Sequence, residues 1–304
     1  MRVTNSTMIN KAIRNVDGAF RRYIQHQEKV ASGRSINHLS DDPHGAARAV
    51  RLRSVLRGVE QYKRNAENAD ISVRTYDDNL NKVGSILNRV RELVVRGATD
   101  SATPTEREAM AVEVRELFDE LVHAGNASHL GVYMYAGYKT GRSPFEAVDD
   151  IGDVNWPVRY FGDSGVNRTE VGPGLTLEIN ITGEQVFMGE GGGVNVFKAV
   201  RQIEQHLAGS DVPELTGSDL ANLDGAINQV LKCRAELGGR GSRLELVTNR
   251  LESDSVSITE LLSKTEDVDL AEAIMRLAEQ EVVYQAALAA AARSVQAGLL
   301  QYLK

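Results

Sequence analysis

An unbroken stripe of apolar and small residues runs from Leu52 to Val94 and constrains the fold of this chain most strongly. Its members alternate at spacings of three and four: Leu52, Val55, Val59, Tyr62, Ala66, Ala69, Val73, Tyr76, Leu80, Val83, Leu87, Val90 and Val94. Such spacing keeps one seam of an α-helix facing a partner helix. At about 1.5 Å per residue it predicts a rod of roughly 65 Å, far longer than a typical helix. The chain is therefore expected to build a scaffold.

Shorter stripes predict further helices around the rod. The first starts the chain and should stop at Gly33, and Asp41-Asp42-Pro43 should cap the rod that follows. Thr103, Pro104 and Glu106 form the pattern of a capping box before a helix that carries Met110 to Ala124. Later stripes run over 196–207, 220–231, 244–261 and 270–299. We expect Gly238-Gly239-Arg240-Gly241 to break the helix between the second and third of these segments, with Ser242 as a cap.

Glycine becomes frequent after Leu130, and short alternating stretches replace the heptads. Val158–Phe161 precedes a Gly-Asp-Ser-Gly turn, and Leu175–Ile181 alternates with period two, as half-buried strands do. We therefore expect a small β domain over residues 135–193, with Trp156 and several tyrosines in its core.

The predicted fold class is mainly α with a small β insertion. Long N- and C-terminal helices pair as a coiled coil or helical bundle, and the β domain projects outward. The predicted domains are 1–45 with 265–304 (terminal helices), 46–134 with 194–264 (helical rod or bundle) and 135–193 (β domain).

The two ends of the chain carry opposite charge. Residues 1–60 hold eleven Lys and Arg against five Asp and Glu, whereas residues 265–304 hold three against six. Opposite signs on two heptad helices favour their pairing with one another, although solvated charged faces explain the same counts equally well.

We expect the terminal helices to form the assembly interface of the protein. Burying each Leu, Ile or Phe contributes roughly 1.5–3 kcal/mol before entropy is counted, so neighbouring subunits would complete what two helices alone cannot bury. The termini should then be disordered in a free monomer and order on assembly. The alanines of 286–292 would let helices approach closely. The predicted interface residues are Ile9, Ile13, Val16, Phe20, Tyr23, Ile274, Leu277, Tyr284, Leu288, Val295 and Leu299.

No motif of catalysis, metal binding or cofactor binding stands out. The six histidines lack the spacing of a zinc-protease helix, and Cys233 has no histidine near it in sequence. Gly238–Ser242 lacks the lysine of a phosphate-binding loop. Asp41-Asp42 beside Pro43 is more typical of a turn. We therefore expect a protein that is not an enzyme, with no catalytic residue, cofactor or metal site.

Composition also bears on partners and location. A net charge of −7 argues against an extended nucleic-acid footprint, which needs a basic face. The first thirty residues lack the apolar core of a signal peptide, and no run of eighteen apolar residues predicts a membrane span. From these features alone, a cytoplasmic protein is expected.

Both ends of the chain resemble the flagellin family. The resemblance at the start lies in Met1–Asn5, Ala31–Asn37 and Ser40–Pro43, and at the end in Ala286–Leu288 and Leu299–Leu303. It covers roughly residues 1–140 and 240–304. Within the family, Pro43 and the stretch Tyr135–Thr140 with Pro144-Phe145 favour a subunit of the hook–filament junction over the filament subunit. His38-Leu39 departs from the family, where a proline often precedes Ser-Asp-Asp.

The resemblance implies an extracellular structural subunit of the bacterial flagellum. Such a subunit is exported unfolded by the flagellar type III apparatus without a cleaved signal, which replaces the cytoplasmic expectation. The resemblance implies a ring that adapts the hook side to the flagellin filament. The implied partners are other copies of the chain, a neighbouring hook-associated protein, flagellin, and an export chaperone at the C-terminal helix. No nucleic acid or membrane partner is implied.

Two other hypotheses remain open from the sequence. Flagellin itself shares the structural class but polymerises indefinitely. A coiled-coil scaffold or sensor, with the β insertion as a ligand module, would be a stable dimer that is not exported.

Overall fold

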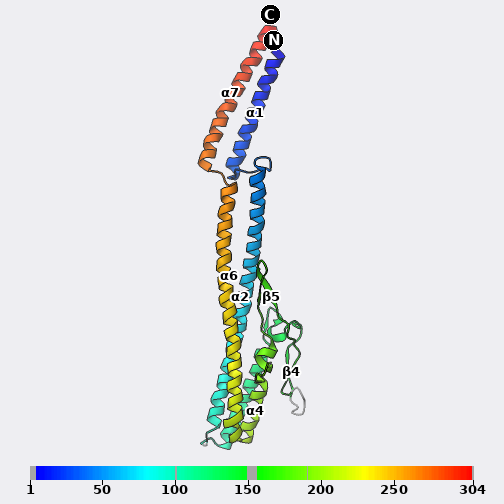
Figure 1. Ribbon diagram of the computed structural model, residues 1–304, viewed down its shortest axis with the longest axis vertical. Coiled ribbons are helices and arrows are strands. Elements are labelled where there is room, and N and C mark those ends of the chain that lie inside the picture. Colours follow the sequence, from blue (N-terminus) through cyan, green and yellow to red (C-terminus); the bar gives the residue numbers. More distant parts are fainter. Residues whose placement is uncertain (1–4, 100, 149–155, 190, 303–304) are drawn as a thin grey trace. The chain divides into compact units, whose positions relative to one another are not determined.

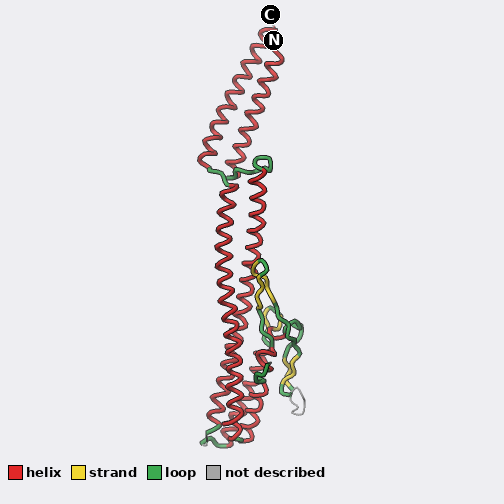
Figure 2. Tube along the Cα trace, in the orientation of Figure 1, coloured by secondary structure: helices red, strands yellow, loops and turns green. Residues whose placement is uncertain are grey.

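The computed structural model describes residues 5–99, 101–148, 156–189 and 191–302, apart from the side chains of 5–6 and 295–302. Helices dominate the described chain, and the strands all fall in its middle (Figures 1 and 2). The helices are α1 (Asn5–Ser32), α2 (Pro43–Gly97), α3 (Pro104–Gly125), α4 (Val196–Gly209), α5 (Val212–Glu214), α6 (Leu220–Glu266) and α7 (Leu270–Tyr302). The mainly α fold class with a β insertion is confirmed.

Within the described residues, the β insertion consists of antiparallel strand pairs together with short helical turns. Three two-stranded sheets pair β1 (Ser128–His129) with β2 (Val132–Tyr133), β3 (Phe145–Ala147) with β4 (Val158–Tyr160), and β5 (Arg168–Gly172) with β6 (Leu175–Glu178). The turns are η1 (Met134–Ala136), η2 (Glu184–Met188) and, beyond the insertion, η3 (Leu215–Asp219). The alternation within 158–160 and 175–178 therefore marks real strands.

The chain divides into two compact units. Unit 1 comprises Met1–Val59 and Ser253–Lys304, and unit 2 comprises Glu60–Glu252. A separate domain over residues 135–193 stays a prediction, as do the other predicted boundaries.

Unit 1 contains an antiparallel hairpin of α1 and α7, which lie side by side in Figure 1. Helix α1 ends before Gly33, whose φ of +70° is a left-handed conformation that glycine adopts without strain. Helix α2 begins at Pro43, and the Asp42 carboxylate accepts a hydrogen bond from the His44 N–H at 3.0 Å. The predicted stop at Gly33 and cap at Asp42 are both confirmed.

Unit 2 has the core of the molecule. The α2 stripe is buried at every position from Ala66 to Val94 and packs in one hydrophobic cluster with residues of α3, α4 and α6. Ion pairs join α2 to α6 at Arg91–Asp224 and Arg234–Asp77. These contacts explain why the sequence sustains the three-four spacing for so long.

The turn between α2 and α3 is closed by polar contacts. Thr103 and Glu106 form the predicted capping box, with the Thr103 N–H donating to the Glu106 carboxylate at 2.8 Å. The buried Arg107 side chain donates to the carbonyl of Gly97, the last residue of α2, and to that of Thr99 in the turn. A cation at a helix C-terminus also matches the helix dipole.

The predicted helix break at Gly238–Gly241 was wrong. Helix α6 runs without interruption from Leu220 to Glu266. Leu237 and Leu244, one on each side of the glycines, are 0% and 1% exposed and pack in the core. The free energy gained by burying these two leucines outweighs the low helix propensity of glycine.

Phenylalanines, rather than the tryptophan, fill the core beneath the β insertion. Tyr135, Phe145, Phe187 and Phe197 are nearly fully buried, with neighbouring ring centroids 5.0–5.2 Å apart. Trp156 is only half-buried. The expectation that tyrosines contribute to this core is confirmed at Tyr135, whereas Trp156 is not one of its buried residues.

Candidate assembly surfaces

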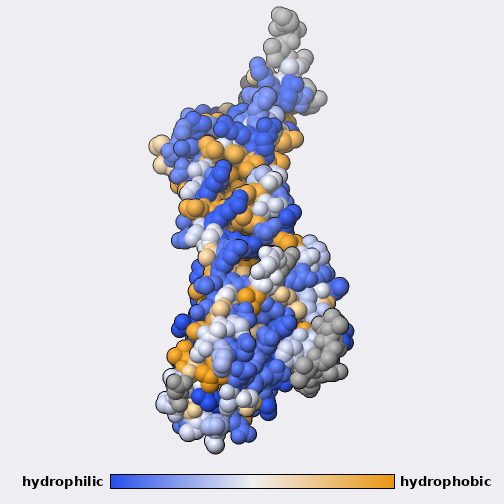
Figure 3. Space-filling model, turned by 60° about the horizontal axis from the view of Figure 1, so that its bottom comes forward, coloured by the Kyte–Doolittle hydropathy of each residue, from blue (hydrophilic) through white to orange (hydrophobic). Residues whose placement is uncertain are grey.

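Small residues hold α1 and α7 together. Ala19 is 1% exposed and Ala273 is 4% exposed, which makes them the most buried described residues of the two helices. Ala12, Ala287 and Ala291 are half-buried in the same contact. Alanine permits close approach of two helices and loses no side-chain entropy on burial. Figure 3 shows hydrophobic and hydrophilic residues interspersed on one face of the molecule.

An aromatic cluster crosses the middle of the hairpin. The ring centroids of Phe20 and Tyr284 are 5.3 Å apart, and those of Tyr23 and Tyr284 are 6.1 Å apart with nearly parallel planes. These pairs link three of the predicted interface residues across the two helices. Offset aromatic pairs of this kind add roughly 0.5–1.5 kcal/mol to the packing.

The predicted interface residues fall into two groups by exposure. Half-buried members are Ile9, Val16, Tyr23, Leu277 and Tyr284. Exposed members are Ile13 (58%), Phe20 (43%), Ile274 (55%) and Leu288 (43%). Val295 and Leu299 lie on α7, but their side chains are outside the described residues. The hairpin therefore leaves large apolar side chains unburied in the single chain.

Charged side chains of α1 and α7 interact both within each helix and between the two helices. Ion pairs lie within the helices at Asp17–Arg21 and Glu272–Arg276. Between the helices, the Arg22 side chain donates to Gln280 at 3.4 Å. Burial lowers the pKa of His26 on α1, and the charges of Arg276 and Glu279 on α7 also act on it.

Glu266 ties the base of the hairpin to α2 within unit 1. Its side chain is 7% exposed and pairs with both Arg34 and Arg53. The Glu266 carbonyl accepts the Ser35 N–H at 2.7 Å, and Arg34 forms a β-bridge with Asp267. The two connecting segments, α1–α2 and α6–α7, are thus fastened to one another.

Asp41 organises the segment between α1 and α2. Its carboxylate accepts the backbone N–H groups of His38 at 3.0 Å and Asn37 at 3.2 Å, and these bonds, the one from His38 foremost, lower the pKa of Asp41. The Gln25 side chain donates to the same carboxylate at 3.3 Å. The first aspartate of the Asp-Asp pair therefore has a structural role, as its place beside Pro43 suggested.

The stretch Tyr135–Thr140 anchors the β insertion on the rod. The Tyr135 hydroxyl donates to Asn79 at 2.7 Å, and the Tyr76 hydroxyl donates to the Met134 carbonyl. Burial raises the pKa of both tyrosines, so they remain hydrogen-bond donors. Gly137 has a φ of +68°, and an added Cβ would lie 2.1 Å from Asp163 Oδ1. A side chain at this position would collide with the neighbouring loop.

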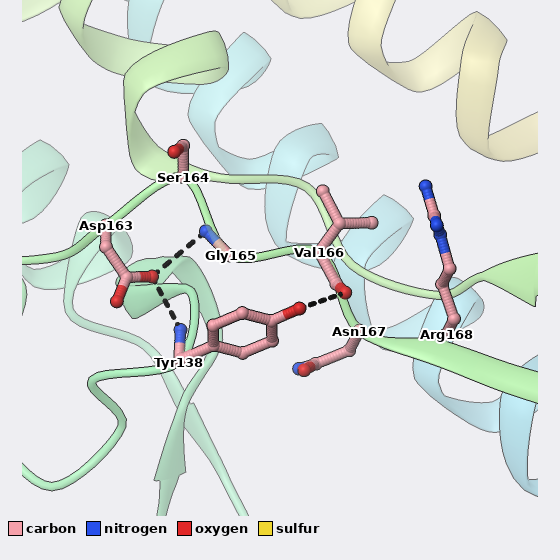
Figure 4. Close-up of a pocket in the computed structure, with 7 residues that line it drawn as sticks. All are labelled: Tyr138, Asp163, Ser164, Gly165, Val166, Asn167 and Arg168. Atoms are coloured by element: carbon pink, nitrogen blue, oxygen red, sulfur yellow. Dashed lines mark hydrogen bonds between the residues drawn. The ribbon is translucent and has the colours of Figure 1, made fainter.

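An open pocket of about 770 Å³ lies beside this stretch, lined by Tyr138, loop residues 163–167 and Arg168 (Figure 4). The Asp163 carboxylate accepts the N–H groups of Tyr138 at 2.7 Å and Gly165 at 3.0 Å, bonds that lower its pKa. The Tyr138 hydroxyl donates to the Val166 carbonyl at 2.8 Å. Asp163 and the Tyr138 hydroxyl therefore use their hydrogen bonds to hold the loop in place. This arrangement is typical of a structural loop and not of a catalytic site.

The cysteine, the potential metal ligands and the apolar helices were also considered as sites of function. Burial raises the pKa of the Cys233 thiol to about 11, so it is protonated at neutral pH. Among the described residues, no group of three or more His, Cys, Asp or Glu side chains could hold a metal ion. None of the described helices is long and apolar enough to cross a membrane.

Family models match both ends of the chain. The model of the bacterial flagellin N-terminal helical region matches residues 3–140, and that of the C-terminal helical region matches residues 220–303. Together the two matched regions cover most of the sequence and contain α1, α2, α3, α6 and α7.

Known relatives are similar over nearly the whole chain. Flagellar hook-associated protein 3 of Escherichia coli is 24% identical, with 94% of each chain covered. Flagellin of Bacillus subtilis is 26% identical, over 90% of this chain and 89% of that protein. A solved flagellar hook-associated protein of Vibrio parahaemolyticus has a TM-score of 0.68 at 23% identity, over 75% of this chain and all of its own. The flagellar junction protein of Legionella pneumophila has a TM-score of 0.59 at 16% identity, over 74% and 100%.

Proposed function

Since the chain belongs to the flagellin family, a family of structural flagellar components and not of enzymes, we propose that it is a subunit of the hook–filament junction. In this function a ring of its copies adapts the hook side of the flagellum to the flagellin filament. The observation that carries the proposal is the hairpin of α1 and α7 with large apolar side chains exposed, in a chain similar to hook-associated protein 3 over its whole length.

The Tyr135–Thr140 stretch gives separate support for the junction. This stretch resembles the corresponding segment of junction subunits, and in the structure it anchors the β insertion through Tyr135 and Gly137. The resemblance adds to the overall identity, which is about equal for hook-associated protein 3 and flagellin.

The proposal includes location, export and partners. The subunit leaves the cell unfolded through the flagellar type III apparatus and resides outside the cell at the junction. Its partners are its own copies, a neighbouring hook-associated protein and flagellin, with an export chaperone at the C-terminal helix before assembly. The interface is expected at the eleven residues predicted from the sequence, of which Ile13, Phe20, Ile274 and Leu288 are exposed in the single chain.

Flagellin is the second candidate function, because the Bacillus subtilis flagellin is also similar over most of its length. The two functions differ in what happens when the chain is missing. Without the junction, flagellin is exported but cannot polymerise on the hook, so it is lost to the medium. Without flagellin, no filament protein is released.

Deletion of the gene, followed by electron microscopy and assay of flagellin in the culture medium, tests the proposal. We expect hooks without filaments and flagellin monomers in the medium, with both defects reversed by the wild-type gene on a plasmid. Bare hooks with no flagellin released would identify the filament subunit instead. Normal filaments would contradict both flagellar functions and favour a scaffold protein.

A further inference from the structure

The terminal hairpin has two different flanks. Successive residues of an α-helix are about 100° apart, so residues two apart point to nearly opposite sides. Lys11 and Ile13 therefore face opposite flanks of α1, and Leu288 and Ala290 face opposite flanks of α7. Each flank of the hairpin can then be described by the residues that it exposes.

One flank carries an apolar ridge. We use this name for Ile13 and Phe20 on α1 with Ile274 and Leu288 on α7, all between 43% and 58% exposed. Ile13 and Phe20 are seven residues apart, and Ile274 and Leu288 are fourteen apart, so each pair lies along one line of its helix. Phe20 contacts Tyr284 and thereby fixes the position of the ridge beside the seam.

The other flank carries an alanine groove. It has a volume of about 310 Å³ and is lined by Met8, Lys11, Ala12 and Asn15 from α1 and by Ala287, Ala290, Ala291 and Ser294 from α7. The α7 side is formed by small side chains alone. Large side chains from another helix could therefore approach the helix backbones closely.

The ridge and the groove lie at the same level of the hairpin. The groove shows that residues 8–15 of α1 lie beside residues 287–294 of α7. Ile13 and Leu288, the outer pair of the ridge, fall within these two spans. A copy placed sideways in the same orientation would thus present its ridge directly to the groove of its neighbour.

We propose that the apolar ridge of one copy inserts into the alanine groove of the next copy, in the same orientation. The occupant of the groove is a second copy of this chain. Such an interface is heterologous, and heterologous contacts close into a ring when the rotation between copies permits it. The proposal rests on the assembly assumed in the proposed function and specifies which surfaces meet.

Disulfide cross-linking of assembled flagella tests this contact. Ile13→Cys and Ala290→Cys are introduced into the full chain in the deletion strain, singly and together, and isolated flagella are treated with copper phenanthroline. The double variant should give a ladder of dimers, trimers and larger species on a non-reducing immunoblot. Each single variant should give monomers. The wild type is the matched control, because Cys233 is buried.

Co-expression sharpens the result. A mixture of the Ile13→Cys chain and the Ala290→Cys chain should stop at dimers, because each chain then carries one reactive flank. A dimer from Ile13→Cys alone would overturn the proposal in favour of a two-fold contact. So would the absence of a ladder in double-variant cells that swim normally.

A second pair covers the case in which these substitutions prevent assembly. Lys11→Cys with Leu288→Cys probes the same level of the hairpin, but here the groove residue lies on α1 and the ridge residue on α7. This double variant must give the same ladder. Where the first pair prevents assembly, the proposal fails if the second pair links no copies while flagella are present. The proposed function fails separately, when deletion of the gene leaves filaments unchanged.

Discussion

At the scale of single residues, Glu266 is the most consequential side chain at the base of the hairpin. A carboxylate that is 7% exposed needs partners, and these are Arg34, in the segment that joins α1 to α2, and Arg53 on α2. Both arginines are themselves 41–50% exposed, so solvent screens each pair and reduces its energy.

Substitution of Glu266→Gln should lower the stability of unit 1. The amide keeps the size of the side chain but loses the charge that both arginines use, and we expect a cost of about 1–2 kcal/mol. Thermal unfolding followed by circular dichroism measures the loss, and hydrogen exchange should locate it at residues 263–268.

Glu260→Gln is the matched control for this prediction, because Glu260 lies on the same helix and is exposed. Its effect should stay within about 0.5 kcal/mol. Equal effects of the two substitutions would show that the Glu266 contacts contribute nothing specific.

The residue scale also shows what the sequence could and could not predict at the candidate interface. The stripe from Ile9 to Val30 predicted a paired helix, and positions 9, 16, 23 and 30 do lie toward α7 as half-buried residues. At intermediate positions the stripe favoured Ile13 and Phe20, whereas Ala19 is the buried residue of α1, and Phe20 contacts Tyr284 while staying 43% exposed. Hydrophobicity selects the larger side chain, but close approach of two helices selects the smaller one.

At the scale of elements, the uninterrupted helix α6 is the clearest departure from the sequence prediction. Gly238 and Gly239 are exposed, and a Cβ added to either would meet nothing within 4 Å. Neither packing nor backbone conformation therefore requires glycine there. Local propensity predicted a break, and the buried leucines on both sides of the glycines determined the outcome.

Gly238→Ala and Gly239→Ala should each stabilise the protein by about 0.5–1 kcal/mol, since alanine loses less backbone entropy in a helix. Chemical denaturation measures the gain, and amide exchange should slow over residues 236–243. A loss of stability would show that the glycines relieve a contact.

Gly97→Ala is the contrasting control. An added Cβ at Gly97 would lie 2.5 Å from Leu207 Cδ2, so a helical glycine in a tight contact must lose stability when replaced. We therefore expect the alanine substitutions to raise stability at the exposed Gly238 and Gly239 and to lower it at the packed Gly97.

The β insertion shows the same limit of prediction from sequence. Alternation predicted strands near 158–160 and 175–178 correctly. It could not show that Phe145, Phe187 and Phe197 meet in one core, because their contacts join segments far apart in the chain. The sequence also favoured the one tryptophan as a core residue, but Trp156 is only half-buried.

At the scale of the whole molecule, similar chains occur in flagella both as hook-associated proteins and as flagellins. The family gives the chain its helical ends, and the sequence patterns at both ends predicted that membership. The distinction between a short ring and a long filament depends on the contacts between neighbouring copies. These contacts are a property of the assembly and not of the single chain.

The most direct measurement of the junction function is immunogold electron microscopy of intact flagella with an antibody raised against this chain. Flagella from the deletion strain provide the control for specificity. The account predicts a single narrow band of gold where the hook meets the filament. Gold along the length of the filament would contradict it and identify the chain as the filament subunit.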